Sequence, residues 1–357
     1  MQKILFLLAL SLIILLSNCI PSRAEKPKRE FKSKKEIPVP TDLDLPRKER
    51  SLRVDHYPAS NEMRIDLFRP YIENLGGIYL GVGTDQNLTF IAWARSNYAY
   101  LMDFDPVVVA VNRIHLYFIE KSPTYAEYKT LWERKNKKTS LELIKKHFAG
   151  DPEYQTILIA WQVAHRGSTD VPERLRDLDF MAKKLKLKTF NNDSSDYNYI
   201  RNMIINKKII AISGDLTGDK SMRSIGETAR SLKIPIRVLY MSNAEEYFRF
   251  PENYRKNIQS LYHDEKSLVI RTSTVGSKFI GYPDGEKFEE MPFHYNIQRI
   301  SNLSKWMSFR HYLSMYYLLS IRSDIEKGFS RIEKNPEDTD LKESGTIDVR
   351  PAGWRWR

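Results

Sequence analysis

From about residue 61 onward, short apolar runs are separated by longer amphipathic stretches, a pattern typical of strands alternating with helices. The clearest unit is a strand at 77–82 that ends in a glycine turn. A helix at 88–95, a strand at 98–102 and a helix from Pro106 to Glu120 follow, and proline is well tolerated in the first turn of a helix. Strand, glycine turn, helix, strand and acidic residue is the order of a βαβ nucleotide-binding half.

The alternation returns later in the chain, with strands at 208–215, 235–240 and 267–272, a helix at 221–232 and His294 on a final edge strand. Strands joined through helices pair in parallel by right-handed crossovers. The pattern therefore predicts an α/β fold with a Rossmann-like, doubly wound, mostly parallel sheet. Residues 121–205 are charge-rich and periodic in the helical sense, which predicts a helical insertion with helices at 154–163 and 171–187.

The N-terminus has the pattern of an export signal. Lys3 precedes an apolar run of about 13 residues, shorter than the roughly 20 that cross a bilayer. Cys19, the only cysteine, stands where a lipoprotein signal peptidase would create the acylated N-terminus. We therefore predict a lipoprotein signal peptide at 1–18 and lipidation of Cys19, although Asn18 replaces the usual Gly or Ala. An uncleaved anchor or an ordinary secretory signal is the alternative.

Charge and proline define the next segment. The chain has a formal net charge of +12, and residues 23–53 combine Lys and Arg with four prolines and few large apolar residues. Such a segment buries too little surface to fold, so we predict a basic, disordered tether over 19–60. Its charge would favour an anionic lipid surface, or it is a solvated linker. The domain would then span 61–322, followed by a polar tail at 323–357.

Polar residues follow the predicted strands where an open parallel sheet binds ligands, at the strand carboxyl ends. Together they form a candidate cofactor site: Gly81, Gly83, Asp85, Gln86, Asn87, Asp103, Asp105, Asp215, Thr217, Ser242 and Asn243.

Two of these features suggest a nucleoside ligand. Gly81 and Gly83 would let the backbone approach it, and Asp103, about 20 residues further on, is placed to accept from ribose hydroxyls. A third glycine is missing and Asp85 would repel a diphosphate, so S-adenosylmethionine fits better than NAD. In the structural alternative, the glycines permit close packing and the aspartates and Ser242-Asn243 cap helices.

Other chemistries lack a signal. The seven histidines show no metal-ligand spacing, so no metal is predicted. No G-x-S-x-G elbow is present, which argues against the commonest α/β hydrolases. No nucleic-acid recognition motif or stacking platform accompanies the basic residues, so nucleic acid is not an expected partner.

Three segments in order, GGIYLGVGTDQN at 76–87, GDLTG at 214–218 and YMSNAEEY at 240–247, resemble a bacterial domain family of unknown function. Its members carry a GVYLGVGxDQN turn, a GDxxG turn and a YxSNxExY segment. The resemblance covers roughly 75–272 and implies a fold similar to class I S-adenosylmethionine-dependent methyltransferases.

Export conflicts with the cofactor that this fold implies, because S-adenosylmethionine and NAD are cytoplasmic. Three functions stay open, since a fold does not fix a function. The first is a binding or structural module, lipid-anchored to a membrane of the cell envelope, with an envelope component as possible partner. The second is a methyltransferase-like enzyme that uses S-adenosylmethionine, and the third is an envelope enzyme using Asp105 or Asp215 as acid or base.

Overall fold

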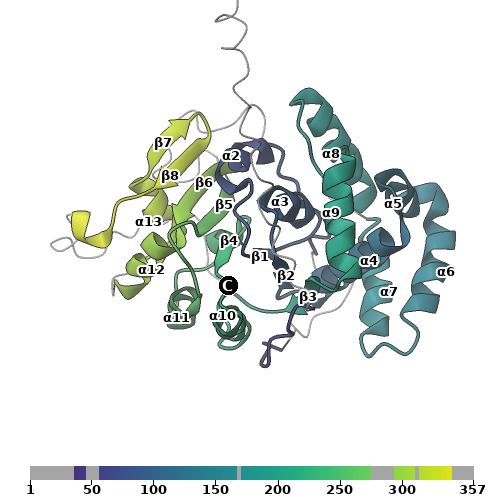
Figure 1. Ribbon diagram of the computed structural model, residues 1–357, viewed down its shortest axis with the longest axis horizontal. Helices are drawn as coiled ribbons and strands as arrows, with labels where there is room; N and C mark the ends of the chain where they lie inside the picture. The colour runs from purple at the N-terminus through teal and green to yellow at the C-terminus, as the bar shows by residue number, and fades with distance from the viewer. Residues whose placement is uncertain (1–35, 46–55, 167–169, 275–292, 310–312, 340–357) are drawn as a thin grey trace, which may run out of the picture. The chain divides into compact units, whose positions relative to one another are not determined.

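The computed structural model describes residues 36–45, 56–166, 170–274, 293–309 and 313–339 (Figure 1). The predicted signal peptide, Cys19 and the last part of the predicted tail lie outside these ranges. Within them, no helix is both long enough and apolar enough to span a bilayer.

Eight strands of the described chain form one sheet in the order β3-β2-β1-β4-β5-β6-β8-β7. From β3 to β5 all neighbours are parallel, and β1 lies between β2 and β4. The strand order therefore reverses between β1 and β4, as in Rossmann folds. The strands are β1 (Ile78–Val82), β2 (Tyr98–Asp103), β3 (Ile209–Ser213), β4 (Ile236–Tyr240), β5 (Leu268–Thr274), β6 (Phe293–Arg299), β7 (Ser323–Glu326) and β8 (Phe329–Ile332).

Helices cover both faces of this sheet because its central strands are apolar on both sides. In β1, Ile78 and Leu80 join one core cluster and Tyr79 joins the other. On the Tyr79 face lie α3 (Gln86–Ala94), α4 (Pro106–Lys121) and α9 (Ser194–Ile205), and on the opposite face α10 (Ser221–Leu232), α11 (Glu252–Ser260) and α12 (Ile300–Ser308) (Figure 1). This arrangement confirms the predicted Rossmann-like, doubly wound fold.

The described part of the segment between β2 and β3 contains helices joined by loops and no strand. After α4 it forms α5 (Tyr125–Trp132), α6 (Lys137–His147), α7 (Tyr154–Val163) and α8 (Val171–Lys184), followed by α9. Trp161 of α7 packs edge-on against Phe118 of α4, with ring centroids 5.8 Å apart. The insertion therefore shares its core with the helices that cover the sheet.

The C-terminal part of the sheet differs from the sequence prediction, which places 323–357 in a polar tail. β8 pairs in parallel with β6, and β7 pairs antiparallel with β8. Phe329 and Ile332 are buried, whereas Ser323, Asp324 and Glu326 are exposed, which explains why the apolar signal is weak. His294 accordingly lies in β6, an inner strand, and not on the sheet edge.

The predicted disorder of the tether does not hold for residues 36–45. The N–H of Ile37 donates to the carbonyl oxygen of Lys207 (2.9 Å), and the Tyr100 hydroxyl donates to the carbonyl oxygen of Pro38 (2.9 Å). The Ile37 side chain is buried in the core of the α10 face. Apolar packing of Ile37 and Leu43 and hydrogen bonds to backbone groups thus hold a segment whose composition predicts no structure.

Candidate functional site

Residues 56–63, which we call the crossing segment, run over the carboxyl ends of the strands. His56 Nδ1 lies 2.6 Å from Asp105 Oδ2, after β2. The N–H of Ser60 donates to Asp85 Oδ1 (2.9 Å), after β1. Glu62 reaches β4 and β5. The point where strand order reverses, which usually holds the ligand in such folds, is therefore covered by the chain itself.

Glu62 has a buried carboxyl group with a hydrogen-bond donor on every side. Its Oε1 accepts from the hydroxyls of Tyr240 (3.0 Å), Ser242 (2.8 Å) and Thr272 (2.8 Å). Its Oε2 accepts from Gln86 Nε2. Burial raises the pKa of Glu62 above its usual range, and the four hydrogen bonds oppose that shift.

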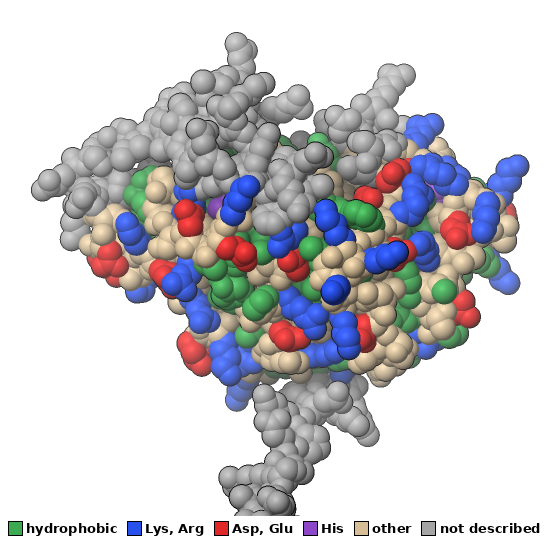
Figure 2. All heavy atoms as spheres, turned by 90° about the horizontal axis from the view of Figure 1, so that it is seen from above, with side chains coloured by type: hydrophobic (Ala, Val, Ile, Leu, Met, Phe, Trp, Pro, Cys, Tyr) green, Lys and Arg blue, Asp and Glu red, His purple; other side chains and the backbone are tan. Residues whose placement is uncertain are grey.

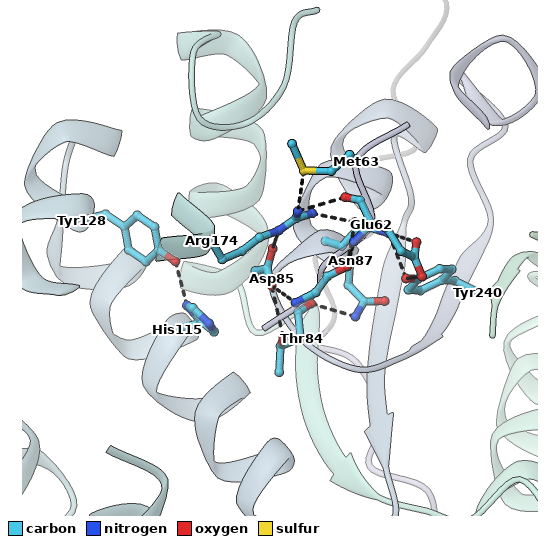
Figure 3. Close-up of polar contacts among 11 residues, drawn as sticks. Glu62, Met63, Thr84, Asp85, Asn87, His115, Tyr128, Arg174 and Tyr240 are labelled. Atoms are coloured by element: carbon cyan, nitrogen blue, oxygen red, sulfur yellow. Dashed lines mark hydrogen bonds and ion pairs between the residues drawn. The ribbon is translucent and has the colours of Figure 1, made fainter. Parts of the chain in front are cut away.

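Arg174 of α8 completes the arrangement from the helical insertion (Figure 3). Its Nε donates to Asp85 Oδ2 (3.0 Å) and its Nη2 to Gln86 Oε1 (2.7 Å). Its Nη1 donates to the carbonyl oxygen of Glu62 (2.9 Å). Arg174 and Asp85 are only 1% and 0% exposed, so the pair is closed to solvent. We call Glu62, Asp85, Gln86, Arg174 and Tyr240 the switch-point cluster.

A buried histidine, His115, lies on the side of Arg174 opposite Glu62, as Figure 3 shows. His115 Nδ1 is 2.7 Å from the Tyr128 hydroxyl, and burial lowers the pKa of His115 to about 4. The ring is therefore neutral at pH 7, consistent with its position in the core between the sheet and the insertion.

The first glycine of the turn has a packing role. A Cβ on Gly81 would lie 2.1 Å from Asn87 Oδ1 and 2.6 Å from Tyr79 Cε1. Asn87 Oδ1 accepts from the Tyr79 hydroxyl (2.7 Å), and Asn87 Nδ2 donates to the carbonyl oxygens of Val82 (3.0 Å) and Thr84 (2.8 Å). Asn87 thus closes the turn, and Gly81 makes room for it.

We expect Gly81→Ala to lower the free energy of unfolding by about 1–3 kcal/mol, because the methyl group overpacks the turn. Urea denaturation followed by tryptophan fluorescence measures this change. In Gly81→Ala/Asn87→Ala the clashing amide is gone. The double variant should therefore lose less unfolding free energy than the sum of the losses in Gly81→Ala and Asn87→Ala. Full additivity would contradict the packing role.

The second glycine lies on an open part of the rim. Gly83 has φ +80°, and a Cβ there would meet no atom within 4 Å. Its N–H donates to Asp103 Oδ2 (3.1 Å), and Asp103 Oδ1 accepts from the N–H of Asp105 (2.9 Å). Burial raises the pKa of Asp103 to about 7, and the neighbouring Phe104 side chain is 45% exposed.

The remaining predicted site residues take part in local structure. Asp105 caps α4, with the N–H of Val107 donating to Oδ1 (2.8 Å). Asp215 Oδ1 accepts from the N–H and the hydroxyl of Thr217, both at 2.7 Å. Asn243 Nδ2 donates to Glu246 Oε2 (3.2 Å) and makes no side-chain cap to the 3-10 helix η3 (Ala244–Tyr247).

The loop between β3 and α10 is tied to the segment before the domain. The Asp44 carboxylate accepts from the N–H groups of Asp215 (3.1 Å), Asp219 (3.2 Å), Lys220 (3.1 Å) and Ser221 (3.3 Å). An acidic side chain at a helix N-terminus satisfies free amides and is favoured by the helix dipole. The chain thus supplies its own anion to α10.

The structure brings Asp85, Gln86 and Ser242 together, and it adds Glu62, Arg174, Tyr240 and Thr272, which sequence reasoning missed. Tyr240 stands in the YMSNAEEY segment, and Gln86 Nε2 donates to its hydroxyl (2.9 Å). Glu62 lies at the predicted boundary between the tether and the domain, and Arg174 lies in the predicted helical insertion. No sequence motif marks either residue. Among the described residues, no group of three or more His, Cys, Asp and Glu side chains could hold a metal ion.

Comparisons with known proteins show a family and distant likenesses to solved structures. Residues 57–333 match the family described as a domain of unknown function, DUF7790. No curated protein matches the chain. Among solved structures, the rRNA methyltransferase AviRa from Streptomyces viridochromogenes matches with 11% sequence identity over 64% of this chain and 81% of that chain, with a TM-score of 0.28. So low a TM-score carries no functional argument, and the fold class is assigned from the strand order.

Proposed function

The chain belongs to the DUF7790 family, and from this premise we propose that it is a binding or structural module, lipid-anchored in the cell envelope, in which the Rossmann-like sheet no longer takes a nucleotide at its switch point. The observation that carries the proposal is the switch-point cluster. Its five side chains fill the crevice between β1 and β4 with satisfied hydrogen bonds and a buried ion pair.

The energetics of that cluster oppose a ligand in the same place. A ligand at the switch point would have to displace Glu62 and separate Arg174 from Asp85. Breaking a buried ion pair costs about 3–5 kcal/mol, which corresponds to a loss of affinity of roughly 150-fold to 5,000-fold. A cofactor would have to overcome this penalty before it gained any affinity.

The anchor part of the proposal rests on the N-terminal sequence. A charged start, a short apolar run and a sole cysteine at position 19 form a lipoprotein-type signal. Export would place the domain where nucleotides are scarce, which agrees with a crevice filled by the chain. The proposed partners are the membrane, through the lipid, and an envelope component bound by the domain.

Calorimetry with S-adenosylmethionine distinguishes the proposed binding or structural module from an enzyme that uses S-adenosylmethionine. We expect no heat of binding up to about 1 mM ligand, a concentration that corresponds to a binding free energy of about 4 kcal/mol. Circular dichroism of the same sample establishes that the protein is folded. Saturable binding with a Kd in the micromolar range would refute the proposal.

Mass spectrometry of the mature N-terminus tests the anchor. In the native host, the wild-type chain should begin at an acylated Cys19, and Cys19→Ala should lose the acyl chains and appear in the soluble fraction. Stable anchoring needs more than one lipid chain. A lipoprotein cysteine carries several acyl chains, so the wild type should remain with membranes. Recovery of an unprocessed wild-type chain from the cytosol would exclude lipidation.

A second candidate, an enzyme that uses S-adenosylmethionine, is favoured by the open rim at Gly83. Gly83, Asp103 and Phe104 could hold a nucleoside beside the filled crevice, with Asp103 accepting from ribose hydroxyls. If the calorimetry detects binding, Asp103→Asn should weaken it at least tenfold. The third hypothesis has less support, because Asp105 and Asp215 are engaged in a helix cap and a turn.

A further inference from the structure

A surface groove lies on the helical insertion. None of the residues of the switch-point cluster lines it. It has a volume of about 950 Å³ and is lined by the C-terminal end of α4, by α5 and by α6. Pockets of roughly 300–1,000 Å³ commonly bind small organic ligands. The groove is therefore large enough for a ligand with an extended apolar part.

The lining of this groove combines apolar and aromatic side chains with polar ones. Leu131 of α5 and Leu143 of α6 line it, and Leu143 is 39% exposed. The Tyr117 ring stacks on the His147 ring with centroids 3.8 Å apart. This surface is suited to contact with hydrocarbon, since exposed apolar patches often mark binding sites.

Positive charge predominates around the groove. Residues 121–147 contain eight Lys and Arg but three Glu, and Figure 2 shows Lys and Arg side chains over the whole visible face, the right-hand end included. Two glutamates are engaged locally: Glu142 pairs with Lys145 (2.8 Å) and Glu127 is part of a capping box with Thr124.

Two lysines, Lys121 and Lys146, line the groove, together with one carboxylate, that of Glu127 in the capping box. Lys121 Nζ lies 5.9 Å from the centroid of the Tyr117 ring. Neither lysine has an ion-pair partner within the described part of the chain. A ligand that neutralises this charge must be anionic.

We propose that the groove binds a single-chain anionic amphiphile, such as a fatty acid, with its hydrocarbon chain over Leu131 and Leu143 and its acidic headgroup at Lys121 and Lys146. The inference goes beyond the proposed function, because it depends neither on the switch point nor on the anchor. Each buried methylene should raise the affinity about fourfold, so the affinity increases with chain length.

Titration calorimetry with laurate below its micellar concentration tests the proposal. Laurate should bind saturably, decanoate about fifteenfold more weakly because it lacks two methylenes, and neutral dodecyl maltoside at least tenfold more weakly than laurate. Acetate should not bind. Absence of laurate binding, or equal binding of dodecyl maltoside, would overturn the proposal.

Variants locate the binding. Leu143→Glu and Lys121→Gln/Lys146→Gln should each weaken laurate binding at least tenfold, and their exposed positions should leave the Tm nearly unchanged. The matched control is Lys135→Gln/Lys138→Gln, which removes two exposed lysines outside the groove lining and should not alter binding. If the control weakened laurate binding equally, laurate would be attracted by the overall positive charge of the surface and not by the groove. That result would refute the site. An acidic amphipathic peptide that binds when laurate does not would also refute it.

Discussion

Arg174→Met is expected to lower the free energy of unfolding by about 3–5 kcal/mol, because it leaves the Asp85 carboxylate buried without its partner. Arg174 and Asp85 are 1% and 0% exposed, so water cannot replace the lost guanidinium. The substitution also removes donors to Gln86 and to the carbonyl oxygen of Glu62. Urea denaturation followed by tryptophan fluorescence measures the loss.

Two further variants distinguish the buried pair from a general charge effect. Arg176, on the same helix, pairs with Glu173 at the surface, where the side chains are 54% and 51% exposed. Arg176→Met should therefore cost less than about 1 kcal/mol. Arg174→Met/Asp85→Asn removes both charges and should recover part of the stability. If Arg174→Met cost no more than Arg176→Met, the cluster would not be a major source of stability.

Raising the pH from about 5 to 8 is expected to remove the stability that the protonated Glu246 carboxyl contributes, whereas the buried His115 and His294, whose pKa values are lowered to about 4, act in the opposite direction. Burial raises the pKa of Glu246 from 4.5 to about 7, so the folded state holds this proton more tightly than the unfolded state. The contribution is fully present below pH 4.5 and is lost as the pH rises through 7. Linkage makes the loss about 3 kcal/mol. Glu62 and Asp103 shift in the same direction.

Urea denaturation at several pH values measures this dependence. Glu246 Oε2 accepts from the Thr274 hydroxyl (2.8 Å) and from Asn243 Nδ2 (3.2 Å), and a glutamine can keep the hydroxyl contact. Glu246→Gln should therefore remove this one contribution, so that the stability of the variant relative to the wild type rises between about pH 5 and 8. A stability difference between variant and wild type that does not change with pH would contradict the role of Glu246.

The sequence predicts the parallel part of the fold well, because its elements have strong local patterns. The helix limits predicted at 154–163 and 221–232 coincide with α7 and α10. The misplaced elements are those stabilised by distant partners. Ile37 is buried only through the α10-side core, and β8 is a strand through its pairing with β6.

The candidate site could be predicted only in part for the same reason. The motif residues Asp85, Gln86 and Ser242 were expected at strand ends, where the structure has them. Arg174, however, is 89 positions from Asp85 in the chain, and Glu62 is 210 positions from Thr272. No local pattern relates such residues, and only packing of the insertion and of the crossing segment brings them together.

The carboxylate of Asp44 at the start of α10 affects how the protein should be produced for experiments. A recombinant fragment trimmed to the family boundary at residue 57 keeps Glu62 but loses Asp44 and Ile37. Such a fragment would present four bare amides to the buffer, and phosphate or sulfate ions could fill the vacancy and be mistaken for a physiological ligand. A fragment that starts at residue 36 avoids this artefact.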